Sequence, residues 1–332
     1  MGDKIKIDLQ DKKLIYYLSM DARLSHSQLS RKIGLSKNAV KYRIERLKRL
    51  GVIHHFASIV NLGSIKITTF TLLLKFNEDI YDKPEIIEFF KEHPFADWVV
   101  TLSGHWDIFV EMASKNIKHM HDLVKEMISK FGDKLNTYKL FLSNDTLRVE
   151  HLVEDFYNDL KLESLPLKER TPHKHKIDFT DMKILQILNE DSSLHYLEIA
   201  RRLNLTIDIV RYRMKNLLDK FIIIKFFAEI NLKKLGYTEY LFFIKLRNVS
   251  SEKFSKIRKS IQTNPNISYA FFDVNNYSIV FNCNFNGVED VDTLSRKLQR
   301  EFNDIIETHE YLLVKEQILF NLFPRGIMSE FI

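Results

Sequence analysis

Cationic side chains are concentrated in residues 36–50 of this sequence, and their spacing could bind phosphate. The segment has one carboxylate, Glu45, and six lysines and arginines: Lys37, Lys41, Arg43, Arg46, Lys48 and Arg49. A cluster of this density attracts a nucleic-acid duplex, because each cation that neutralises a phosphate releases condensed counterions. Asn38 adds an amide that can pair bidentately with an adenine edge.

The same segment has the periodicity of an amphipathic helix. Val40, Ile44 and Leu47 recur at three- and four-residue spacings, so at about 100° per residue they share one narrow face. The other positions carry the residues that we expect at a DNA contact: Ser36, Lys37, Asn38, Lys41, Tyr42, Arg43, Arg46 and Arg49. A solvated charged face on an ordinary surface helix is the alternative interpretation, and the surrounding elements decide between the two.

Two further helices are predicted ahead of this one. The apolar pairs that mark them are Leu14 with Leu18 and Leu29 with Ile33. Ser25 or Ser27 can cap the second helix and Ser36 the third, since a serine hydroxyl accepts a backbone N–H at such positions. After the third helix, residues 52–60 are predicted as two short strands, the wing of a winged helix-turn-helix. In that motif the third helix enters the major groove, which favours the DNA contact.

The whole pattern occurs twice at an offset of 170 residues. The register holds without a gap for more than fifty residues, and identical pairs include Leu18 and Leu188, Arg31 and Arg201, Tyr42 and Tyr212, Arg43 and Arg213, and Asn61 and Asn231. Chance does not keep a register for that length, so the chain is two copies of one unit.

The third helix of the second copy keeps the frame and loses part of the cationic surface. Ile207 and Asp208 stand where the first copy has Lys37 and Asn38, and phosphate repels a carboxylate at that tip. The candidate DNA contacts that remain are Arg211, Tyr212, Arg213 and Lys215. We expect the second module to bind DNA weakly, to bind a different sequence, or to act only as a structural partner.

A ferredoxin-like βαββαβ pattern follows each helix-turn-helix. In the first copy we expect strands at 69–76, 96–102, 105–113 and from 137 onward, with helices at 83–93 and 116–131. In the second copy we expect strands at 240–246, 268–273, 277–285 and 309–319, with helices at 252–263 and 288–302. The predicted class is α+β, two winged helix-turn-helix domains alternating with two ferredoxin-like domains. The expected boundaries are 1–63, 64–150, a linker at 151–176, 177–233 and 234–332.

The first copy resembles the Lrp/AsnC family of feast/famine regulators, strongly over 7–63, and the second copy resembles it more loosely over 177–236. The residues that carry the resemblance are Asp8, Asp11, Asp21 to Ser25, Leu29, Ser30, Gly34 to Ser36, Val40, Arg43, Ile44, Leu47, Gly51 to Ile53 and Gly63. The resemblance implies a DNA-binding transcription regulator. It also implies a ferredoxin-like domain that mediates dimerisation and binds small effectors, often amino acids.

The family's glycine-turn-aspartate signature appears here as residues 104–107. Gly104 lets backbone N–H groups approach a ligand carboxylate closely, His105 follows it, and Asp107 can accept a hydrogen bond from an α-ammonium group. We therefore expect an effector site at Gly104, His105 and Asp107. In the second copy Asn275 and Ser278 replace the glycine and the aspartate. The alternative interpretation is that the turn is only a turn.

Most members of the family carry one copy per chain, so the tandem form leaves the assembly open. We expect double-stranded DNA as partner, an amino acid as possible effector, and either a homo-oligomer or an intrachain pseudo-dimer. A partner that assembles with single-copy relatives without reading DNA is an alternative from another class.

An enzyme is the strongest rival, since siroheme decarboxylases resemble this architecture. Candidate residues for a tetrapyrrole site are His54, His55, His105 and Tyr277, but Asp107 would repel the carboxylates of such a substrate. We expect no catalytic residues and no cofactor, because glycine-rich phosphate loops and hydrolase motifs are absent from the sequence. His119 with His121 and His173 with His175 lack a third ligand nearby, so no metal site is predicted.

Composition agrees with a globular protein of several domains. The 332 residues carry a net charge of +6, and 45% of them are hydrophobic. The single cysteine, Cys283, excludes an intramolecular disulfide and is expected to be buried in a strand. Residues 1–13 lack an apolar signal region and no stretch is long and apolar enough for a membrane helix, so we expect a cytoplasmic protein.

Overall fold

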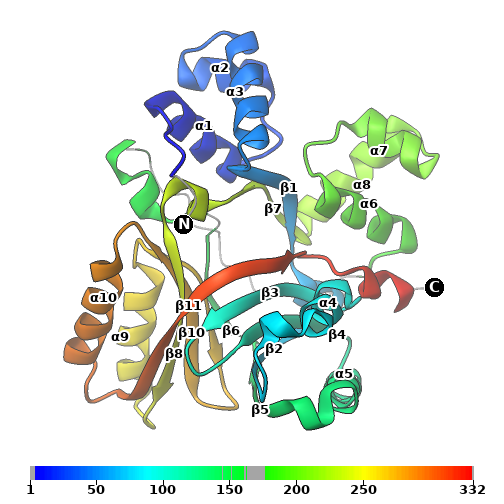
Figure 1. Ribbon diagram of the computed structural model, residues 1–332. Helices are drawn as coiled ribbons and strands as arrows, with labels where there is room; N and C mark the ends of the chain where they lie inside the picture. The colour runs from blue at the N-terminus through cyan, green and yellow to red at the C-terminus, as the bar shows by residue number, and fades with distance from the viewer. Residues whose placement is uncertain (1–3, 144, 151, 161, 163–175, 331–332) are drawn as a thin grey trace. The chain divides into compact units, whose positions relative to one another are not determined.

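The computed structural model describes residues 4–143, 145–150, 152–160, 162 and 176–330 (Figure 1). The chain divides into two compact units, and each unit takes one part from each copy. The first unit comprises residues 1–65 and 150–237 and contains both helix-turn-helix modules. The second comprises residues 66–149 and 238–332 and contains both ferredoxin-like domains.

Three helices form each helix-turn-helix module, as the sequence predicts. The first module has α1 (Leu9–Met20), α2 (His26–Ile33) and α3 (Lys37–Arg49), and the second has α6 (Phe179–Glu190), α7 (Tyr196–Leu203) and α8 (Ile207–Asp219). Ser25 caps α2 in a reciprocal capping box with Gln28, and Ser36 caps α3. Gly34 ends α2 with φ 77°, a left-handed conformation that favours glycine.

The expected wing of two short strands is wrong. Residues 53–60 form one strand, β1 (Ile53–Val60), which pairs antiparallel with β7 (Ile223–Ile230) of the other copy. A hairpin within residues 52–60 would need turn residues, and this segment has no glycine, proline or asparagine. The helices also contact the strand of the other copy, since α1 packs against β7 and α6 packs against β1. The two modules therefore share one two-stranded ribbon.

Part of the expected linker is described. It contains two short 3-10 helices, η4 (Glu154–Phe156) and η5 (Asn158–Leu160), and the buried ring of Tyr157 lies 4.9 Å from the ring of Tyr16 in α1. The Lys12 ammonium pairs with Asp159 at 2.5 Å. This segment is thus docked on the first module, whereas residues 163–175 of the expected linker lie outside the described residues.

Both βαββαβ predictions are confirmed. The first domain runs β2 (Thr68–Phe76), α4 (Pro84–Glu92), β3 (Ala96–Ser103), β4 (Ile108–Ser114), α5 (Ile117–Phe131) and β5 (Leu135–Leu142). The second runs β8 (Thr238–Leu246), α9 (Ser251–Gln262), β9 (Ile267–Asp273), β10 (Ser278–Phe285), α10 (Val288–Glu301) and β11 (Ile306–Phe320). An additional strand, β6 (Asp145–Val149), follows the first domain. The remaining 3-10 turns are η1 (Leu62–Ile65), η2 (Ile80–Asp82), η3 (Gly132–Lys134), η6 (Leu232–Leu235) and η7 (Arg325–Glu330).

The two ferredoxin-like domains share one nine-stranded sheet. Its order is β5-β2-β4-β3-β11-β8-β10-β9-β6, so β3 of the first domain pairs with β11 of the second, and β6 pairs with β9. Aromatic side chains from both domains meet in a common core, where the rings of Phe141 and Phe243 lie 5.6 Å apart. An intrachain pseudo-dimer is therefore built into this unit.

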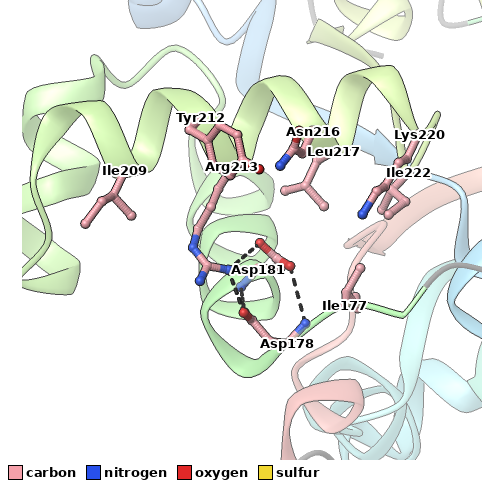
Figure 2. Close-up of a pocket in the computed structure, with 10 residues that line it drawn as sticks. All are labelled: Ile177, Asp178, Asp181, Ile209, Tyr212, Arg213, Asn216, Leu217, Lys220 and Ile222. Carbon is pink, nitrogen blue, oxygen red and sulfur yellow. Dashed lines mark hydrogen bonds and ion pairs between the residues drawn. The ribbon is translucent and has the colours of Figure 1, made fainter.

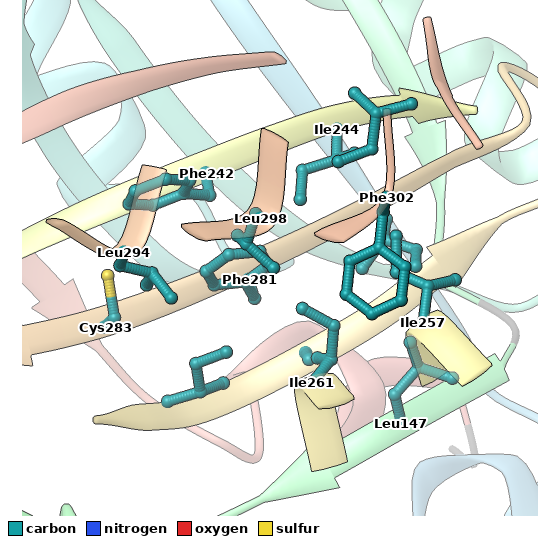
Figure 3. Close-up of a cluster of buried hydrophobic side chains, with 14 of the residues drawn as sticks. Leu147, Phe242, Ile244, Ile257, Ile261, Phe281, Cys283, Leu294, Leu298 and Phe302 are labelled. Carbon is teal, nitrogen blue, oxygen red and sulfur yellow. The ribbon is translucent and has the colours of Figure 1, made fainter. Parts of the chain in front are cut away.

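Each ferredoxin-like domain also has a core of its own on the helical side. In the second domain, Ile257 and Ile261 of α9 and Leu294 and Leu298 of α10 pack on apolar side chains of the sheet (Figure 3). Cys283 lies fully buried in this cluster, as expected, and burial raises the pKa of its thiol. Among the described residues, no helix is long and apolar enough to cross a bilayer.

Candidate nucleic-acid interface

The exposed face of α3 carries most of the residues predicted to contact DNA. Val40, Ile44 and Leu47 are buried, and this orientation leaves the opposite side of the helix in solvent. The exposed polar residues are Ser36, Lys37, Asn38, Lys41, Tyr42, Glu45, Lys48 and Arg49. Four cations therefore stand against one carboxylate on this face. Lys48 also lies over the ring of Phe56, with its ammonium 4.7 Å from the centroid.

Arg43 and Arg46 are engaged inside the module. The Arg43 guanidinium donates to the Asp8 carboxylate at 2.8 Å and to Asp11 at 2.6 Å, and Arg46 donates to Asp11 at 2.8 Å. Asp8 caps α1 in a reciprocal capping box with Asp11, so this network ties α3 to the first turn of α1. The hydrogen bonds that Arg43 donates to Asp11 and Asp8 raise its pKa. These arginines hold the helix in position, a role that the sequence analysis did not anticipate.

The second module repeats the Arg43 contacts of this network and has a weaker cationic face. Arg213 donates to Asp178 at 2.7 Å and to Asp181 at 2.9 Å, as Arg43 does in the first module. Arg211 pairs with Asp208 at 2.9 Å, so the tip of α8 is neutralised. The exposed charges of α8 are two cations, Arg211 and Lys215, and two carboxylates, Asp208 and Asp219.

A groove of about 450 Å³ opens beside α8 (Figure 2). Asn216 stands where the first copy has Arg46, so Asp181 pairs with Arg213, whereas Asp11 pairs with two arginines. Ile177, Ile209, Leu217 and Ile222 are among the lining residues. The two equivalent helices therefore present different surfaces.

Arg23 joins the two modules, and the sequence did not predict this role. Its guanidinium donates to the carbonyl oxygens of Ser192 at 2.6 Å and Leu194 at 2.9 Å, in the second module. It also lies 5.0 Å from the ring centroid of Tyr196. Burial lowers the pKa of Arg23. The contact partners are about 170 residues away along the chain, so no local pattern could indicate this role.

The candidate effector residues lie in the turn between β3 and β4. Both carboxylate oxygens of Asp107 have donors, since Lys75 Nζ lies 3.0 Å from Oδ1 and the Phe76 backbone N–H donates to Oδ2 at 2.7 Å. Gly104 has φ 131°, and a Cβ there would lie 2.9 Å from the Leu312 side chain. His105 is exposed, so the turn brings the three residues together with Asp107 already occupied by protein donors.

The equivalent turn of the second copy has a structural role. In the first turn Thr101 pairs with Ile108, and in the second Phe272 pairs with Ile279. By this register Asn275 is equivalent to Gly104, and Ser278 is equivalent to Asp107. In this turn Asn276 donates to the carbonyl of Leu140 at 2.8 Å. The turn thereby docks on β5, the last strand of the first domain.

Family models match both helix-turn-helix modules. A model described as "Winged helix-turn-helix DNA-binding" matches residues 7–54. A model described as "AsnC-type helix-turn-helix domain" matches residues 177–218. The matches begin at residues 7 and 177, which is the same offset that relates the two copies.

Similar proteins of known sequence are named as regulators. The uncharacterized HTH-type transcriptional regulator PH0140 of Pyrococcus horikoshii is 26% identical over 143 residues, which are 42% of this chain and 89% of that protein. The uncharacterized HTH-type transcriptional regulator PF1734 of Pyrococcus furiosus is 33% identical over 116 residues, which are 35% of this chain and 77% of that protein. Each match covers most of the relative and less than half of this chain, as expected for relatives with one copy of the unit.

Among solved structures, the siroheme decarboxylase NirDL shares the fold of the whole chain. The TM-score is 0.64 at 14% sequence identity, and the match covers 97% of this chain and 98% of NirDL. A second NirDL structure, in complex with an iron-uroporphyrin III analogue, matches with the same TM-score. At this identity the likeness establishes the tandem fold and leaves the chemistry to the residues.

Proposed function

Because this chain belongs to the Lrp/AsnC family of helix-turn-helix transcription regulators, we propose that it is a sequence-specific DNA-binding regulator that reads DNA through α3. One observation carries the proposal. The exposed face of α3 presents Lys37, Lys41, Lys48 and Arg49 with Asn38 near the tip, and a single carboxylate opposes these charges. Cations position the helix on phosphates, and the amide can discriminate a base edge.

The proposal is tested by selecting bound duplexes from a random DNA pool with purified full-length protein. Enrichment of one sequence motif, followed by salt-sensitive binding of a duplex that carries it, is the expected result. Recovery of unenriched pool sequences would contradict sequence-specific recognition.

We further propose that the first module dominates the affinity. The four exposed cations of α3 exceed its carboxylate by three, whereas the exposed charges of α8 balance. Asp208 is paired with Arg211 at the tip of α8, the end that would approach the bases. The second module then contributes weakly through Tyr212 and Lys215, or serves as the partner that completes the β1–β7 ribbon.

A siroheme decarboxylase of the same fold is the alternative function, and it predicts a different experimental result. A siroheme decarboxylase must gather basic groups around a tetrapyrrole's carboxylates. Of the four residues considered for that role, His54 and His55 instead contact the carboxylate of Glu229. Incubation of the protein with siroheme distinguishes the two functions. A decarboxylase converts siroheme to a decarboxylated product over hours, whereas a regulator forms no such product and leaves the absorbance spectrum unchanged.

Effector binding at Gly104, His105 and Asp107 is the second part of the proposed function. An amino acid bound there would replace the Lys75 ammonium on Asp107 with its own α-ammonium, an exchange between charge-assisted hydrogen bonds. Calorimetric screening of the amino acids should find at most one site per chain. Asp107→Ala should abolish that site, whereas Ser278→Ala at the equivalent position of the second copy should leave it intact. Two equivalent sites, or undiminished binding by Asp107→Ala, would contradict an effector site at this turn.

A further inference from the structure

Two adjacent histidines of β1 reach the same carboxylate because the strand is bulged. Ile53 pairs with Ile230 and Phe56 with Ala228, so His54 and His55 together oppose the single residue Glu229 of β7. In a regular strand, successive side chains point to opposite faces of the sheet. A bulge re-aims one of them, which explains how both imidazoles come to lie beside one glutamate.

The three side chains form a compact set of metal-ligating atoms. His54 Nδ1 lies 3.0 Å and His55 Nδ1 2.6 Å from the same oxygen, Oε2 of Glu229. One ligand atom from each residue lies within 4.8 Å of the other two. Two ligands on a tetrahedral ion with bonds of about 2.1 Å lie about 3.4 Å apart, so small rotations of the side chains would give this spacing.

Burial and charge suit the group to a cation. The side chain of Glu229 is 11% exposed and that of His54 is 64% exposed, so the carboxylate forms the floor and solvent reaches the open side. Glu229 supplies a carboxylate oxygen to the set, a hard donor that a divalent cation attracts.

The internal duplication supplies a second bulge without ligands. Ile59 pairs with Lys225 and Val60 with Ile223, so Ile224 and Lys225 oppose Ile59 at the other end of the ribbon. The backbone geometry is repeated, while the two histidines and the glutamate are replaced by two isoleucines and a lysine. The ligand set is thus a property of one end of the ribbon and is not required to form the bulge.

We propose that His54, His55 and Glu229 bind one divalent transition-metal ion of the Zn²⁺ or Co²⁺ class, with water in the remaining position. Two imidazoles and one carboxylate match the preferences of these ions and leave a coordination position open. Because the ligands come from β1 and β7, the ion links strands of both copies and stabilises the ribbon that joins the two helix-turn-helix modules. None of the three ligands belongs to the proposed DNA contact on α3 or to the effector turn.

The test measures Co²⁺ and Zn²⁺ binding to tag-free, full-length protein by calorimetry, with the visible absorbance of bound Co²⁺ as a second readout. The loss variant is His54→Ile combined with His55→Lys, which installs the residues of the second bulge. The gain variant is Ile224→His with Lys225→His and Ile59→Glu, which installs the ligands at the empty bulge. His119→Ala with His121→Ala is the control for histidines elsewhere.

The wild type and the His119/His121 control should each bind one ion per chain. The loss variant should bind more than about 100-fold more weakly, since even outer-shell partners of a metal are worth about 10–100-fold. The gain variant should bind a second ion, which no effect of the loss variant on folding can imitate. Absence of binding by the wild type, or equal binding by the loss variant, would overturn the proposal. Circular dichroism of each variant verifies the fold.

Discussion

Asp11 is fully buried at the start of α1, and its contacts tie α3 to that helix. Its two carboxylate oxygens accept hydrogen bonds from Arg43 and Arg46. In the second copy, Asp181 accepts the equivalent hydrogen bond from Arg213. Arg43, Arg46 and Arg213 were predicted on the DNA surface because the local pattern indicates only a charged helix face. Their carboxylate partners lie 32 to 35 residues upstream, beyond any helical periodicity.

Arg43→Ala should destabilise the fold through loss of the contact with Asp11. Removing a charged hydrogen-bond partner of a buried carboxylate costs about 2 kcal/mol, so the free energy of unfolding in urea should fall by that amount. Arg213→Ala is the matched variant and should cost a similar amount. Lys41→Ala should leave the free energy of unfolding unchanged, because Lys41 is exposed. An unfolding free energy that is insensitive to Arg43→Ala would contradict the framework role.

Glu111 should make the stability of the protein depend on pH. Burial raises the pKa of Glu111 from 4.5 to about 7, and burial together with Glu111 raises the pKa of the neighbouring Asp97. A carboxyl with a raised pKa contributes stability that is complete below its unfolded pKa and is lost as the pH rises through the folded pKa. The free energy of unfolding should therefore fall by about 1 kcal/mol from about pH 6 to about pH 8.

Glu111→Gln supplies the control for this pH dependence. The variant keeps a side chain of similar shape beside Tyr269 and cannot ionise. Its unfolding free energy should be higher than that of the wild type at about pH 8 and should vary less across the interval. A wild type whose stability rises with pH over this interval would contradict the raised pKa of Glu111.

At the scale of elements, the periodicities predicted the helices and both βαββαβ domains because these patterns are local. The third strand of the first domain, β4, was expected to begin at His105, but Gly104 to Asp107 form a turn, and β4 begins at Ile108. The prediction of a two-stranded wing was wrong for a different reason. Residues 53–60 read correctly as extended chain, but the partner of β1 is β7, about 170 residues away, and nothing in the segment identifies it.

The functional residues were predictable from the sequence only where a local pattern places them. Exposed residues of α3 were found from the sequence because a helix sorts its faces by period. Glu229 was not connected with His54 and His55, because that contact depends on strand pairing and on a bulge. Adjacent histidines in a predicted strand were the signal that was present, but they could not reveal a third ligand.

Strand pairing between the copies predicts the behaviour of a fragment. Residues 1–150 contain β1, β3 and β6 but not their partners β7, β11 and β9, so three strands that are paired with the second copy in the full chain lose that partner. Open apolar edges pair with other chains, so this fragment should form dimers or larger species in sedimentation experiments. The full chain supplies the control, since its copies satisfy these edges internally. A folded, monomeric fragment would contradict the shared ribbon and the shared sheet.

At the scale of the whole molecule, covalent duplication has allowed the two copies to diverge while they keep one frame. The α1–α3 arginine network, the bulges of the ribbon and the ferredoxin-like strands occur twice. The exposed charges of the third helix, the turn at Gly104 and the residues at the bulges differ between copies. Each unit pairs the two copies, and of the two third helices only α3 presents an excess of exposed cations, so we expect the chain to contact DNA asymmetrically.

The salt dependence of DNA binding tests this central claim most directly. The affinity of a selected duplex should be measured at several salt concentrations for the wild type, for Lys37→Ala with Lys41→Ala, and for Arg211→Ala with Lys215→Ala. Each phosphate contact contributes about 0.9 to the slope of log affinity against log salt. The α3 variant should therefore lose up to about 2 in slope and bind much more weakly, while the α8 variant stays close to the wild type. Equal losses from the two variants would contradict the asymmetry, and an affinity that is insensitive to salt would contradict DNA binding through α3.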